Sequence, residues 1–83
     1  MLHLLGMSKQ IVADGAVTAI DMLCRARHVN HSELAALLGI SRSAMSLKMS
    51  GRNVFTLSQI HRIADYFDVS VDALLGREPL EVS

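Results

Sequence analysis

A three-residue join at Gly39-Ile40-Ser41 constrains the fold of this chain more than any other feature. The segments on either side, residues 30–38 and 42–49, both carry apolar residues at helical spacing. Gly39 suits the C-cap of the first helix, and Ser41 suits the N-cap of the second. Because only one residue separates these caps, the sequence predicts two short helices that cross at a steep angle.

Small and apolar side chains are placed to fill that corner. Ala35 permits a close approach of the two helices, and Leu38, Ile40 and Met45 are expected to pack between them. With Met45 directed inward, the second helix presents four residues outward, namely Arg42, Ser43, Ser46 and Leu47. A short exposed helix with an arginine, hydroxyl groups and no acidic residue suits insertion into the major groove of DNA.

Three further helices are predicted around this pair, which makes the chain all-α. The first spans about Gln10–Ala26, the fourth spans 57–67, and a short fifth spans 71–75. Capping boxes are predicted for Asn30 with Glu33 and for Thr56 with Gln59. The predicted buried face of the fourth helix consists of Leu57, Ile60, Ile63, Ala64 and Phe67.

Length and composition indicate a single small domain. We expect the domain over residues 10–76, an N-terminal extension over 1–9 and an extended tail over 77–83. The only cysteine, Cys24, excludes an internal disulfide and suits a reducing compartment. The apolar runs are far shorter than the roughly 18 residues of a membrane span, and residues 1–7 lack the charge of a signal peptide. A cytoplasmic location, in the bacterial cytoplasm or nucleoid, is therefore expected.

The net charge is zero, but the charges are unevenly distributed. Between residues 34 and 64 the chain has no acidic residue and four basic ones, Arg42, Lys48, Arg52 and Arg62. Residues 65–83 hold five acidic residues and only Arg77 as a base. Such a positive middle is suited to a polyanion, although a chance gap between acids on a solvated surface is the alternative.

The segment His31–Ser46, the Ser50-Gly51-Arg52 turn and the Phe55-Thr-Leu segment resemble the lambda-repressor/Cro-like (XRE) helix-turn-helix family. The segment Phe67–Leu75 is similar to the last helix of that family, and the resemblance covers about residues 20–75. It implies a five-helix lambda-repressor-like DNA-binding domain with a helix-turn-helix at about 30–49.

The resemblance also implies roles at individual positions. His31 lies in the first turn of the second helix, where the family has a glutamine bound to a phosphate. Arg42 and Ser43 match the start of the recognition helix, and Arg42 has the donors to bind guanine O6 and N7. The expected DNA-binding residues are His31, Ser41, Arg42, Ser43, Ser46, Leu47, Lys48, Arg52 and Asn53.

More specific roles in DNA binding are expected for four of these residues. Leu47 is expected to contact a thymine methyl group, although the family more often has a polar residue there. Lys48 stands where a buried aliphatic residue is usual, so its stem is expected to pack while its ammonium reaches a phosphate. Arg52 and Asn53 match a loop that grips the DNA backbone without reading sequence.

The chain departs from the family at two paired positions. Where the family commonly has an arginine in the first helix and a glutamate at the end of the third, this chain has Cys24 and Met49. Both charges are absent together, so we expect an apolar contact in place of a buried ion pair, a replacement that is often neutral or stabilising.

Catalysis and metal binding are not expected. Cys24, His28 and His31 lack a fourth ligand at zinc-finger spacing. No glycine-rich loop or Ser-His-Asp arrangement stands out, so we expect neither an enzyme nor a cofactor. A protein-interaction module or an antitoxin on the same fold remains the alternative to a DNA-binding protein.

The resemblance favours a sequence-specific transcriptional repressor, of the kind of phage Cro proteins or compact immunity repressors, that blocks a promoter sterically. Such a protein is expected to bind an inverted repeat in double-stranded DNA as a homodimer. Two apolar groups are candidate dimer contacts, Leu74, Leu75, Leu80 and Val82, or Leu2, Leu4 and Leu5. The alternation from Leu80 to Val82 also suggests an added strand.

Overall fold

Five helices and no strand are present in residues 16–81, the part of the chain that the computed structural model describes. The first is helical over 16–27, followed by α2 (His31–Leu38), α3 (Arg42–Met49), α4 (Leu57–Phe67) and α5 (Val71–Leu74). The all-α, five-helix prediction is confirmed, and α3 has the predicted bounds. The predicted helix start at Gln10 and the extension over 1–9 lie outside the described residues.

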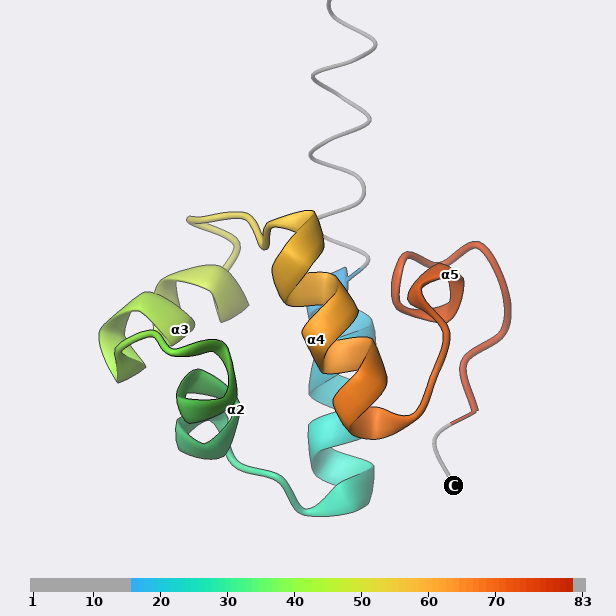
Figure 1. Cartoon of the computed structure of the whole chain (residues 1–83), viewed down its shortest axis with the longest axis horizontal. Coiled ribbons are helices and arrows are strands. Elements are labelled where there is room, and N and C mark those ends of the chain that lie inside the picture. The colour runs from blue at the N-terminus through green and yellow to red at the C-terminus, as the bar shows by residue number, and fades with distance from the viewer. Residues whose placement is uncertain (1–15, 82–83) are drawn as a thin grey trace, which may run out of the picture.

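Helix α4 is the centre of the arrangement (Figure 1). It contacts α2 and α5, and α2 contacts α3. In the figure α2 and α3 lie together on one side of α4, while α5 and the C-terminal segment lie on the other. All five helices contribute to one core, whose largest fully buried side chains are Ile20, Leu23, Leu34, Met45, Ile63, Phe67 and Leu74. No helix within the described range is long and apolar enough to cross a membrane.

Each of the four later helices begins at a side-chain cap. Asn30, Ser41, Thr56 and Ser70 each accept a hydrogen bond from the backbone N–H three residues later, at 2.8 to 3.1 Å. Such a bond satisfies one of the amides that a helix start leaves without an internal partner. At Thr56 the predicted capping box is complete, because the Gln59 side chain accepts from the Thr56 N–H at 2.9 Å. At Asn30 the structure forms only the Asn30 half of the predicted box.

Three of the helices end in the left-handed conformation. Gly39 ends α2 with φ 69°, as predicted, while His28 and Asp68 end the first helix and α4 with φ 56° and 57°. At each end the following N–H donates to a carbonyl five residues earlier, at 3.0 Å. These bonds satisfy the last carbonyls of the helix. Composition did not single out His28 or Asp68, although both residue types tolerate this conformation better than most.

The prediction that Leu57 belongs to the buried face of α4 is wrong, because 63% of its surface is exposed. The rest of that face, including Ile60 and Phe67, is buried as predicted. Leu57 is the first residue of α4, and helical spacing alone does not show whether a neighbour covers that end of the helix. Instead, Phe55 and Ile60 occupy the two positions of a hydrophobic staple, and both are buried.

The prediction that Leu74 lies in a dimer interface is also wrong, since Leu74 is fully buried in the core of its own chain. Leu75 caps the end of α5, one residue beyond the helix. Leu75 and Leu80 are partly buried and pack against the core. Leu80 is not in a strand. Val82, Leu2, Leu4 and Leu5 lie outside the described residues, and the domain limits at 10 and 76 stay predictions.

Candidate nucleic-acid interface

The corner between α2 and α3 is packed as the sequence predicts. Ala35, Leu38 and Met45 are buried, and Ile40 packs against the same core. The left-handed Gly39 turns the chain, and the Ile40 N–H donates to the Ala35 carbonyl at 3.0 Å. An added Cβ at Gly39 would meet no atom within 4 Å, so glycine is favoured here by its backbone conformation alone.

Helix α3 presents most of its surface to solvent. Met45 is its only buried residue, and Arg42, Ser43, Ser46 and Leu47 are exposed. The structure thus brings together on one helix the four residues that the sequence predicts at its outer face. The Ser41 hydroxyl oxygen accepts from the Ala44 N–H, so its hydroxyl hydrogen stays available to a ligand.

A hollow of about 260 Å³ lies between the first turn of α2 and the outer face of α3. It is lined by Asn30, His31, Ser32, Arg42 and Ser46. The N–H groups of a first helical turn and the positive end of the helix dipole attract anions, and an arginine adds a full charge. A DNA phosphate fits this chemistry. The sequence predicts His31, Arg42 and Ser46 as DNA-binding residues but not Asn30 or Ser32. Asn30 was predicted only as the cap of α2, and nothing in the sequence pointed to Ser32.

The segment between α3 and α4 is held in a defined turn. The Leu47 carbonyl accepts from the Arg52 and Asn53 N–H groups, at 2.9 and 3.1 Å, and from the Ser50 hydroxyl at 3.1 Å. Gly51 has φ 83°. Arg52 and Asn53 are exposed in the loop that follows α3. Backbone bonding therefore positions the two residues that are expected to grip a DNA backbone.

Lys48 has an intramolecular partner that the sequence did not indicate. Its ammonium donates to the Val54 carbonyl at 2.8 Å and lies 5.7 Å from the centre of the Phe55 ring. The residue is partly buried, and its ammonium is directed to its own loop. The only sequence signal was that a lysine stands where an aliphatic residue is usual.

The charges of this surface are not neutralised from within the described part of the chain. The ion pair recorded in residues 16–81 is Arg25 with Asp21 at 3.1 Å, on the first helix. Arg42 and Arg52 are exposed and have no acidic partner among the described residues. Uncompensated arginines on an exposed helix and its adjoining loop are suited to a polyanion.

The family model described as the BetR domain matches residues 7–81. This chain belongs to the BetR domain family. BetR domains are small helical DNA-binding domains of the helix-turn-helix kind. No curated protein and no solved structure matches the chain.

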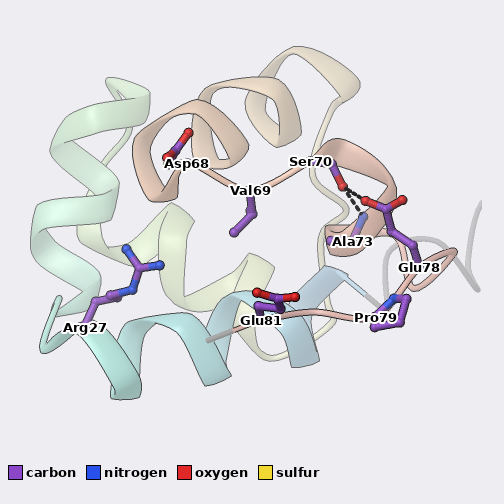
Figure 2. Close-up of a pocket in the computed structure, with 8 residues that line it drawn as sticks. All are labelled: Arg27, Asp68, Val69, Ser70, Ala73, Glu78, Pro79 and Glu81. Atoms are coloured by element: carbon purple, nitrogen blue, oxygen red, sulfur yellow. Dashed lines mark hydrogen bonds between the residues drawn. The ribbon is translucent and has the colours of Figure 1, made fainter. Parts of the chain in front are cut away.

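The far side of the BetR domain has the opposite chemistry (Figure 2). A hollow of about 410 Å³ lies among the end of the first helix, the start of α5 and the C-terminal segment. Its charged residues are Arg27 and three acids, Asp68, Glu78 and Glu81. The Ser70 hydroxyl donates to the Glu78 carboxylate while it accepts from the Ala73 N–H. Three carboxylates repel phosphate, so this hollow is less suited to DNA than the side of α2 and α3.

Cys24 and Met49 of the BetR domain both lie in apolar surroundings at the hydrophobic core. Cys24 is buried in the core, and Met49 packs against that core. Burial raises the pKa of the Cys24 thiol above its ordinary value, and the nearby Asp21 and Glu33 carboxylates raise it further. The thiol is therefore held in its neutral form, which packs as a small apolar group. Within residues 16–81, no three His, Cys, Asp or Glu side chains gather as a metal site.

Proposed function

We propose that this BetR domain is a cytoplasmic, sequence-specific regulator of transcription without enzymatic activity. It binds double-stranded DNA and represses by covering a promoter. The observation that carries the proposal is the surface formed by α3 and the first turn of α2. Arg42 and Ser46 line a hollow beside the α2 N-terminus, with no acidic partner for Arg42 among the described residues.

In this proposal α3 enters the major groove. Arg42 binds guanine O6 and N7, and Leu47 contacts a thymine methyl group. His31 and the first N–H groups of α2 bind one phosphate, and Arg52 and Asn53 bind others. Base contacts then come from α3, whereas the phosphate contacts set the position of the domain on the duplex.

We further propose a lambda-repressor/Cro-like mode in which two copies bind an inverted repeat. Helix α3 has eight residues and so extends about 12 Å, which is enough for only a few base pairs. Two half-sites about 10 bp apart would supply the missing specificity. Sedimentation with and without DNA tests this part, and a monomer mass under both conditions would contradict it.

The first experiment is a selection from random duplex DNA at about 100 mM salt, where phosphate contacts alone are already weakened. We expect enrichment of an inverted repeat. If nothing is enriched, and binding is absent at low salt as well, the DNA-binding proposal fails.

A protein-interaction module, such as an antitoxin, is the second candidate, and one observation favours it. Leu47, Val54 and Leu57 are 39%, 49% and 63% exposed, and they lie on α3, on the following loop and at the start of α4. Exposed apolar residues that form a continuous patch are typical of partner surfaces. Salt distinguishes the candidates, because DNA binding through several phosphates weakens steeply between low and moderate salt and an apolar contact does not.

A further inference from the structure

We propose that Lys48 is a positioning residue that holds the 50–54 loop in the shape in which Arg52 and Asn53 meet the DNA backbone. The proposal rests on the DNA-binding function above, and it changes the role expected for Lys48. In place of a direct phosphate contact, its ammonium acts through the loop.

The loop is tied to two consecutive residues of α3, Leu47 and Lys48. At one anchor the Leu47 carbonyl accepts from the Arg52 and Asn53 N–H groups, at 2.9 and 3.1 Å. At the other, the Lys48 ammonium donates to the Val54 carbonyl at 2.8 Å. The two residues proposed to bind phosphate are therefore bonded to α3 through their own N–H groups, and the residue that follows them is held by Lys48.

The second anchor is in turn connected to the core. The Lys48 ammonium lies 5.7 Å from the centre of the Phe55 ring, a distance at which a cation is attracted to an aromatic face. Phe55 is buried in the core and follows Val54 directly. The ammonium thus joins α3, the end of the loop and the core at one point.

A restrained loop favours binding because less conformational freedom is lost when the complex forms. Arg52 and Asn53 are exposed, and their backbone is bonded to Leu47 before any ligand arrives. Loss of the Val54 anchor would leave the Leu47 bonds as the main restraint on the loop. The side chains of Arg52 and Asn53 would then sample more orientations.

The test compares Lys48→Met, which keeps the apolar stem but removes the ammonium, with Lys48→Arg, which keeps a charged donor. In the free protein we expect faster amide hydrogen exchange at Arg52 and Asn53 in Lys48→Met, and wild-type rates in Lys48→Arg. Exchange at Ile63, in the middle of α4, serves as the internal reference. An equal rise at all three amides, or none at Arg52 and Asn53, would overturn the proposal.

The second part of the test measures binding to random-sequence duplex DNA. We expect Lys48→Met to weaken binding about tenfold, equivalent to about 1.4 kcal/mol. Arg77→Met, which removes a cation from the acidic C-terminal region, is the matched control and should have little effect.

A double-mutant cycle with Arg52→Ala separates positioning from direct contact. If Lys48 positions the loop, Arg52→Ala costs less in the Lys48→Met background than in the wild type. Additive losses, with a salt dependence reduced by about 0.9 of a unit of slope for one lost phosphate contact, would show that Lys48 binds phosphate itself. If the wild-type protein binds no DNA, the proposed function fails, while the exchange rates still decide whether Lys48 holds the loop.

Discussion

Helices α3 and α4 follow each other in the chain but contribute in opposite ways to the protein. Helix α4 buries Ile60, Ile63, Ala64 and Phe67, whereas α3 buries only Met45. Helix α4 starts with a complete capping box, and α3 starts with the Ser41 cap alone. Of these two helices, α4 therefore contributes more to the stability of the domain, and α3 offers more surface to a ligand.

This difference shows how a small domain exposes a binding helix without losing its fold. Burial of apolar surface stabilises roughly in proportion to the area removed from water, so an exposed helix contributes little. Helix α3 is held by Met45, by the packed corner and by the loop that follows it. Substitutions in the two helices should accordingly separate into effects on stability and effects on binding.

Phe67→Ala should have the largest effect on stability. Removal of a fully buried aromatic ring from the core should lower the free energy of unfolding by about 3–5 kcal/mol. That is a large part of the 5–15 kcal/mol typical of whole domains. Urea unfolding measures the change, with Leu47→Ala on α3 as the control, expected within about 0.5 kcal/mol. Similar losses for both variants would refute the division between the helices.

Arg42→Ala should show the reverse behaviour. We expect the free energy of unfolding to stay nearly constant while binding to the selected operator loses about 1–3 kcal/mol. Binding to random DNA should weaken less, because a base contact is lost. Titration of both DNAs, with Arg52→Ala as the comparison, tests this prediction. Arg52→Ala should weaken both complexes about equally, and the same pattern for Arg42→Ala would place Arg42 on the DNA backbone.

Gly39→Ala should loosen the connection of α3 to the rest of the domain. A side chain in the left-handed conformation at φ 69° costs about 1 kcal/mol, and no steric clash adds to it. We expect that loss in the free energy of unfolding and a weaker operator complex. Gly39→Asn is the matched variant, because asparagine tolerates this conformation and should retain more stability. Equal stability of the alanine variant and the wild type would contradict the role given to this glycine.

Leu57→Ala should have the smallest effect, although Leu57 lies on the α4 face that the sequence predicts as buried. With 63% of its surface exposed, we expect a change below about 0.5 kcal/mol in the free energy of unfolding. Ile60→Ala, one turn further along, should cost about 2–5 kcal/mol. Thermal unfolding of both variants makes the comparison, and a Leu57→Ala loss as large as that of Ile60→Ala would return Leu57 to the core.

Much of the fold follows from local signals. The caps at Ser41 and Thr56, the glycine at the corner and the spacing of apolar residues predict α3 and α4 within one residue of their observed bounds. These signals work because a cap or a helical period depends on residues a few positions away. The outward face of α3 follows for the same reason, since Met45 marks the inward direction.

The predictions that were wrong or missing concern contacts between residues that are distant in the sequence or that belong to different elements. Periodicity gives the direction of a side chain around the helix axis but not what lies opposite, so it misplaced Leu57 at the open end of α4. It also left Leu74 as a candidate partner contact, although the core of its own chain covers it. The partner of Lys48 is a backbone carbonyl. Every residue has such a carbonyl, so the residue types in the sequence could not predict this contact.

Residue order alone therefore decides where α2, α3 and α4 start, where the chain turns between α2 and α3, and which face of α3 is exposed. These properties depend on hydrogen bonds and steric limits within a few residues. Tertiary structure alone decides which helix end is covered, which leucine is removed from solvent and where the Lys48 ammonium goes. Those outcomes depend on the path of the whole backbone, which brings Val54 and Phe55 to Lys48 and leaves Leu57 mostly exposed.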